Sequence, residues 1–248
     1  MTLLPGTPSD DVADVLATGG GEVTTVFVSM ATRHPDGADA DYLRWHTLDH
    51  RPEQHRLAAV RASLRLVSTP ACRAARAAGH QRFDPIDHVM TYFFTDPSGL
   101  EGFLALARAL RKAGRNLTVL PPVERGVYEV QSKVAAPRIR VGADVLPWFP
   151  IRGVYLLLER GTTPAQNLVD VAGVAGVWSA SVMNVDPKLA SAQSGQSITY
   201  CFLDDDPVAT GVRLVSVLAN RWSVSGVEPL LAAPFYVVVP YQWDRYVP

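Results

Sequence analysis

The 248-residue sequence has few of the features that mark secreted, membrane-spanning or nucleic-acid-binding proteins. Its two cysteines, Cys72 and Cys201, are far apart and belong to no ligand motif, so neither a disulfide framework nor a zinc finger is expected. The net charge of −1 gives no general attraction to nucleic acid or to an anionic membrane. No apolar run reaches the roughly 18 residues of a membrane span. Asp10, Asp11 and Asp14 stand where a signal peptide would be apolar, and we therefore expect a cytoplasmic protein.

Two common catalytic and cofactor-binding motifs are also missing. Gly19-Gly20-Gly21 precedes an expected strand, whereas a phosphate-binding loop follows a strand and opens a helix. The sequence contains no Gly-x-Ser-x-Gly elbow, so a nucleophilic serine of that type is not expected. We accordingly expect no organic cofactor.

The sequence does contain a cluster of histidines. Three of its six histidines, His46, His50 and His55, fall between positions 46 and 55. The first two lie in a segment that is expected to be a helix, with Asp39 as its N-cap, over residues 39–50. Pro52 disfavours helical geometry in the residue before it and can itself open a second short helix. Histidine is the side chain whose ordinary pKa lies near neutrality, so proton-transfer chemistry would be sought here first.

The order of expected elements predicts an α+β fold of two tandem ferredoxin-like repeats. Strands are expected at 22–30, 60–68, 86–95 and 126–134, with helices at 39–50 and 97–114, which gives the order βαββαβ. That order recurs, with strands at 151–159, 176–185, 197–203 and 235–241 and helices at 164–171 and 207–222.

Two pairs of tyrosines support a duplication, because Tyr92 and Tyr128 have counterparts 108 residues later in Tyr200 and Tyr236. Tyr92 and Tyr128 lie on expected strands, and we expect them to point into a barrel interior and pack in the core. We expect the two sheets to pair into an α/β barrel within one chain. The expected division is listed by residue range: a flexible N-terminal arm 1–22, repeat 1 at 23–134, a linker 135–150 and a degenerate repeat 2 at 151–248.

One stretch of the histidine-bearing segment resembles the signature of the EthD-like family of the dimeric α/β-barrel superfamily. Arg44, Trp45, His50 and Pro52 occupy its Arg, Tyr, His and Pro positions, whereas His46 stands where the family usually has Trp. The resemblance implies a barrel fold and a small-molecule pocket. The superfamily includes cofactor-free monooxygenases, polyketide cyclases, lactone isomerases, dehydratases and some haem enzymes, so the fold is implied more firmly than a reaction.

His50 is the candidate general acid or base, because a histidine beside a pocket can exchange a proton with an enol, phenol or carbonyl substrate. The competing interpretation is that His50 only fixes the helix end by a hydrogen bond to its own loop. Candidate substrate-binding residues share an aromatic ring or a hydrogen-bonding group near the same site: Trp45, His46, Arg61, Arg65, His88 and Tyr92.

Residues 54–83 contain six arginines and no acid. Arg61 and Arg65 are expected on one face of a strand, where guanidinium groups could hold a carboxylate or phosphate. The alternative is that these arginines pair with acids elsewhere in the fold.

His46 and His50 also have the i, i+4 spacing of two metal ligands on one helix face, with Glu53 or His55 as a third. Thr47 stands where the metalloprotease motif requires glutamate, so no metal site is predicted, and haem or a divalent metal is kept as an alternative.

The resulting prediction is a cofactor-independent enzyme that acts on a small hydrophobic oxygenated substrate, phenolic, enolic or polyketide-like. It would be a cyclase, isomerase, lyase or monooxygenase that uses His50 as general acid or base. The alternatives are a non-catalytic small-molecule-binding or assembly protein of the same fold and a haem- or metal-binding member. A homodimer is left open, and no nucleic-acid or membrane partner is expected.

Overall fold

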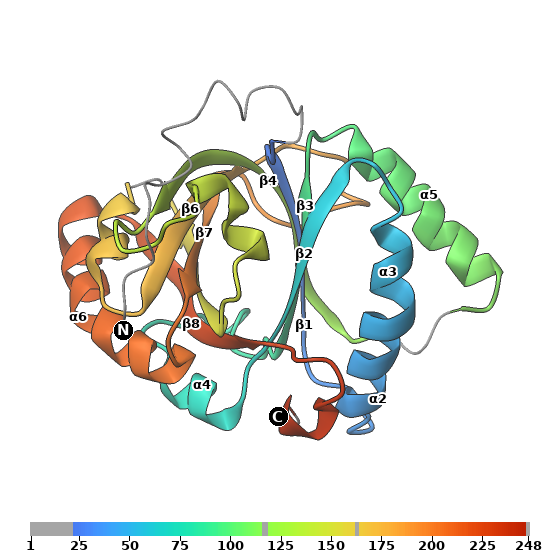
Figure 1. Ribbon diagram of the computed structural model, residues 1–248, viewed down its shortest axis with the longest axis horizontal. Helices are drawn as coiled ribbons and strands as arrows, with labels where there is room; N and C mark the ends of the chain where they lie inside the picture. The colour runs from blue at the N-terminus through green and yellow to red at the C-terminus, as the bar shows by residue number, and fades with distance from the viewer. Residues whose placement is uncertain (1–21, 116–118, 162–163, 247–248) are drawn as a thin grey trace.

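The computed structural model describes residues 22–115, 119–161 and 164–246. The expected N-terminal arm therefore lies outside the described residues, apart from its last position. Eight strands of the described chain close into one antiparallel barrel (Figure 1). They are β1 (Thr25–Ala31), β2 (Val60–Val67), β3 (His88–Phe94), β4 (Pro122–Ala135), β5 (Gly153–Arg160), β6 (Val174–Val182), β7 (Gln196–Leu203) and β8 (Glu228–Val237).

Helices connect and cover these strands. In the first half they are α2 (Asp39–Trp45), the π-helical turn η2 (His46–His50), α3 (Arg51–Gln54), α4 (Pro70–Ala74) and α5 (Gly99–Lys112). The rest of the chain contributes η3 (Ala143–Trp148), η4 (Gln166–Asp170), α6 (Pro207–Ser225) and η5 (Trp243–Tyr246). Among the described helices, none combines the length with the apolar character that crossing a membrane would need.

The strand order around the barrel is β1-β3-β2-β8-β5-β7-β6-β4. The first half thus contributes the order β4-β1-β3-β2 and the second half the order β8-β5-β7-β6, and each pairing is antiparallel. Two seams join the halves. The β4–β6 seam runs from Tyr128 to Ala135, whereas the β2–β8 seam pairs only Leu66 with Val237 and Val67 with Tyr236. The expected α+β class and the barrel closed within one chain are confirmed.

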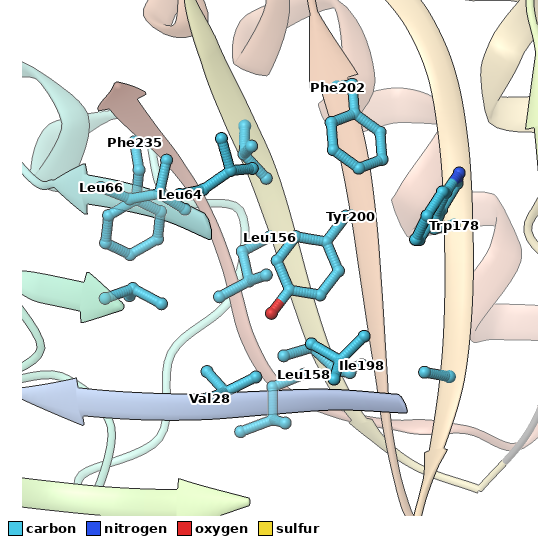
Figure 2. Packing of buried hydrophobic residues seen from close by; sticks show 14 of the residues in the cluster. Val28, Leu64, Leu66, Leu156, Leu158, Trp178, Ile198, Tyr200, Phe202 and Phe235 are labelled. Atoms are coloured by element: carbon cyan, nitrogen blue, oxygen red, sulfur yellow. The ribbon is translucent and has the colours of Figure 1, made fainter. Parts of the chain in front are cut away.

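The barrel interior is filled by apolar side chains that alternate along the strands (Figure 2). Leu156, Trp178 and Phe93 are buried there, and the Tyr200 hydroxyl lies 3.0 Å from Thr91 Oγ1. Alternation places every second residue of a strand inside, so the neighbouring residues face the helices outside. The barrel is therefore a packed core.

The helices cover two opposite outer faces of the barrel (Figure 1). Helices α2, α3 and α5 lie beside the first-half strands, and α6 lies on the other side. Helix α5 presents Leu100 and Phe103 to Phe27 and Phe94 of the sheet, as its amphipathic pattern predicts. Helix α6 begins at Pro207, where the Asp206 carboxylate accepts hydrogen bonds from two backbone amides.

Three expectations about the chain's local course were wrong. The expected break before Pro52 is absent, because the wide turn η2 gives room to a proline ring that would meet a carbonyl in an α-helix, and the helix that starts at Asp39 continues to Gln54. Pro52 does stand in the first turn of a short helix, α3, as expected. The last strand starts at Glu228 rather than at 235, because Pro229 and Pro234 are accommodated beside β5. The expected helix at 164–171 is only a short 3₁₀ turn.

The tyrosine correspondence was also wrong in its register. Tyr92 faces the helices, whereas Tyr200 points into the barrel beside Phe93. Tyr128 is likewise inside, while Tyr236 packs outside and donates a hydrogen bond to the Asp206 side chain. In each pair, the two tyrosines 108 positions apart point to opposite faces of the barrel wall. Because side chains alternate with a period of two along a strand, two residues that both point inward must here be an odd number of positions apart. The expectation that Tyr92 points into the interior fails for the same reason.

Candidate active site

A cavity of about 270 Å³ lies between the outer face of the first-half sheet and the helices that cover it. Its walls come from strands β1, β2, β3 and β4, from α2, η2 and α5, and from the residues just before β4. Its lining residues, which are largely aromatic, aliphatic or cationic, are Phe27, Ser29, Ala31, Tyr42, Trp45, His46, His50, Arg65, Met90, Tyr92, Phe103, Leu104, Ala107, Arg108, Arg111, Val119, Leu120, Pro122 and Arg125. The site thus lies beside the barrel rather than within it.

The π-helical turn η2 arranges three of the lining rings. The Arg51 amide donates to the His46 carbonyl, five residues back, instead of four as in an α-helix. The wider turn brings Trp45 and His50 together, with ring centroids 5.1 Å apart and planes 27° from parallel. The His46 and His50 rings are 5.5 Å apart. Turns of this kind are frequent at functional sites, since they re-aim side chains within a helix.

Both histidines are neutral near pH 7. Burial lowers the pKa of His46 well below its ordinary value, and the nearby Arg65 and His50 lower it further. Burial also lowers the pKa of His50, against an opposing effect of Asp49. Among the described residues, neither His46 Nδ1 nor His50 Nδ1 has a hydrogen-bond partner. A neutral imidazole with a free ring nitrogen can exchange a proton with a bound molecule.

A buried chain of polar groups stands behind the cavity wall. Arg65 Nη2 lies 3.2 Å from His88 Nδ1, and His88 Nε2 lies 2.7 Å from Asp39 Oδ1. Because arginine can only donate, His88 Nδ1 accepts and its Nε2–H donates to the carboxylate. Burial lowers the pKa of His88, with the Asp39 hydrogen bond opposing it. Burial alone would raise the pKa of Asp39, but hydrogen bonds from His88 and from the His34 amide outweigh it and leave that pKa lowered.

Arg65 and Tyr92 are two buried polar groups on the sheet side of the cavity. Both are only 3% exposed. The Arg65 guanidinium carbon lies 4.8 Å from the centre of the Tyr42 ring, which holds it by a cation–π contact. The Tyr92 hydroxyl has no partner among the described residues, and burial raises its pKa, so it remains a hydrogen-bond donor.

The structure brings together five of the seven residues singled out from the sequence. Their common feature is that they line this one cavity: Trp45, His46, His50, Arg65 and Tyr92. Arg61 shares the outward face of β2 but is exposed near His55 and Trp148, in a separate depression beyond a β-bulge. His88 does not line the cavity and instead supports Arg65 from behind.

Sequence reasoning missed several lining residues. Tyr42 lies four positions before His46 on the same helix face, which is a signal that could have identified it. Phe103, Ala107 and Arg111 recur at the same spacing on α5, but their pattern also describes a helix packed on a sheet. Arg125 reaches the cavity from β4, and nothing local in the sequence indicates that.

Other arginines of the segment 54–83 do pair with acids. Arg82 meets Glu124 at 3.0 Å and Arg73 pairs with Asp87. The alternative interpretation therefore holds for these arginines and not for Arg65. Over the described ranges, no three histidine, cysteine or acidic side chains come together in a group that could hold a metal ion.

The sequence matches no family model and no curated protein. Solved structures resemble it at low identity. A candidate chlorite dismutase superposes with a TM-score of 0.51 and 10% identity, over 91% of this chain and 100% of the other. A dye-decolorizing peroxidase from Bacteroides thetaiotaomicron gives 0.49 and 9%, over 91% and 94%. An anthrone oxidase-like protein gives 0.47 and 14%, over 88% and 92%. The first likeness shows that the two chains share a fold.

Proposed function

We propose that this chain is a cofactor-independent enzyme of the EthD-like type, acting on a small hydrophobic oxygenated substrate with His50 as general acid or base. The two halves would be tandem ferredoxin-like repeats, 23–134 and 151–248, joined by the linker 135–150. The observation that carries the proposal is the cavity itself, in which a neutral histidine lies beside stacked aromatic rings and a buried arginine. An apolar pocket with a few polar groups is the usual form of a small-molecule site.

The proposed reaction begins with proton transfer. The substrate ring would pack against Trp45 and Phe103, and His50 would take a proton from a C–H beside a carbonyl or from a phenolic O–H. The enolate or phenolate oxygen would then be held by the Arg65 guanidinium and the Tyr92 hydroxyl, fixed donors whose effect is strong in a buried site. Such an anion is the common first intermediate of cyclisation, isomerisation, C–C or C–O lysis and oxygenation of an activated phenol.

Gln54 would support both roles of His50. Its amide nitrogen lies 3.4 Å from His50 Nε2, and its oxygen has no partner within the described residues. Turning the amide over would let that oxygen accept from Nε2–H. Either proton arrangement of the imidazole is thereby accommodated, leaving Nδ1 for the substrate. His46, neutral and neighbouring, would hydrogen-bond the substrate.

The test is turnover of a panel of anthrones, naphthols and aryl β-diketones by the His50→Gln variant. We expect kcat/KM to fall by about 100-fold or more, the usual contribution of a general acid or base. In the unmodified protein, kcat/KM should rise with pH through an inflection below 6.5 and then level off, because the base is the neutral form and the pKa of His50 is lowered.

His55→Gln is the matched control, since His55 bonds Ser63 outside the cavity at 2.7 Å, and it should stay within about twofold. Full turnover by His50→Gln would show the mechanism to be wrong. Binding of the panel without any conversion would favour the non-catalytic binding protein. An absorption band of haem, or a stoichiometric metal in the purified protein, would favour the third alternative.

A further inference from the structure

The cavity lining carries positive charge and, among the described residues that form it, no acidic side chain. Arg65 is buried at the sheet side, whereas Arg108, Arg111 and Arg125 are exposed and therefore stand where the cavity meets solvent. The wall between these two groups is apolar, with Phe103, Leu104 and Ala107 from α5 and Met90 from β3 contributing to it. The lining residues thus combine one buried cation with an exposed arginine group.

The exposed arginine group is not used for ion pairing. Arg108, Arg111 and Arg125 have no acid within ion-pair distance among the described residues, whereas Arg115, just beyond the end of α5, pairs with acids of the helix segment η2–α3. Those acids are taken by Arg115, which lies 3.0 Å from Asp49 and 2.8 Å from Glu53. The three guanidinium groups at the cavity opening are therefore available to bind an anion.

We propose that the substrate is an amphipathic anion, a ring whose oxygen is held at Arg65 and whose far end carries a carboxylate or phosphate bound by Arg108, Arg111 and Arg125. This inference rests on the proposed function and names its substrate class. Guanidinium groups bind both oxyanions through paired hydrogen bonds. Three guanidinium groups at one opening also raise the local concentration of an anionic ligand, an effect that salt screens.

The experiment compares binding of three probes by calorimetry: 2-naphthol, 6-hydroxy-2-naphthoate and 6-hydroxy-2-naphthyl phosphate. The ring and hydroxyl are the same in all three, so differences report the group at the far end. We expect one or both anions to bind about tenfold or more tighter than 2-naphthol, and the preferred anion identifies carboxylate or phosphate. The advantage should shrink about threefold or more between 50 mM and 500 mM NaCl.

The Arg108→Gln/Arg111→Gln double variant should lose most of this advantage while binding 2-naphthol as before. Lys112→Gln is the matched control, because it removes one positive charge from the exposed last turn of α5 without touching the cavity lining. The inference that the substrate carries an anionic group is wrong if all three probes bind alike, or if Lys112→Gln weakens binding of the two anions as much as the double variant does. The proposed function is unaffected by either result. If none of the three binds, both proposals fail.

Discussion

At the scale of single residues, Asp39 explains how a charged arginine can sit in an apolar wall. A buried cation without compensation is strongly unfavourable, and Arg65 is compensated through His88 by a carboxylate that is itself fully buried. Neutral His88 links the two charged groups because it accepts a hydrogen bond from Arg65 on one nitrogen and donates one to Asp39 from the other. The orientation of Arg65 therefore depends on a residue that does not touch the cavity.

Asp39→Asn should lower the free energy of unfolding by about 1–3 kcal/mol, because it removes the charge while retaining the shape of the side chain. Urea denaturation measures the loss. The matched control is Asp41→Asn, which changes an exposed acid in the same first turn of α2 and should shift stability by no more than about 0.5 kcal/mol. Equal effects of the two substitutions would contradict the role assigned to Asp39.

At the scale of elements, the π-helical turn decides which rings face the cavity. Its extra residue is accommodated without interrupting the helix, and the pairing of Trp45 with His50 depends on it. Leu48 is 44% exposed and belongs to this turn, so a residue can be added beside it without opening the core. A change in this turn should therefore move the rings of the site without a large loss of helix stability.

Inserting one alanine after Leu48 should put Trp45 and His50 six positions apart and separate their rings, because residues six apart lie on different faces of a helix. We expect the far-ultraviolet circular dichroism to keep its helical signal and turnover to drop by about tenfold or more, as displacement of reacting groups does. Leu48→Ala, which keeps the chain length, should leave turnover within about twofold. Retained activity in the insertion variant would show that the turn does not position His50.

The helix that begins at Asp39, the order of elements in the first half and five residues that line the cavity could be predicted from the sequence, because hydrophobic period and motif spacing encode them. The π-helical turn could not, since one extra residue hardly disturbs a period of 3.6. The facing of Tyr92 was mispredicted because a strand's inward set depends on long-range pairing, which sequence offset alone does not fix. Asp39 looked like a helix cap, and only the fold places it against His88.

At the scale of the whole molecule, buried neutral histidines couple folding to pH. The pKa values of His46 and His88 are lowered in the folded protein, chiefly by burial. Below about pH 6.5, the ordinary histidine pKa, the unfolded chain therefore binds more protons than the folded one, and stability falls as pH falls. The loss continues until the lowered folded pKa values are reached.

We expect the free energy of unfolding to decrease by roughly 2–4 kcal/mol between pH 7.5 and pH 5.0, about half of it through His46. Urea denaturation at both pH values measures this. His46→Gln should remove about half of the decrease, whereas His80→Gln, which changes an exposed histidine, should leave it intact. Stability that is constant over this range would show that these histidines are not held neutral.

The short β2–β8 seam gives the barrel an uneven resistance to opening. Two register pairs hold it, and the Val238 amide adds one hydrogen bond to the Arg65 carbonyl at 2.9 Å. Partial opening of a protein starts where fewest contacts must break, so amide hydrogens of this seam should exchange with solvent before those of the β4–β6 seam. Because Arg65 belongs to the strand that would be released, a ligand bound by its guanidinium group would slow that exchange and stabilise the closed barrel.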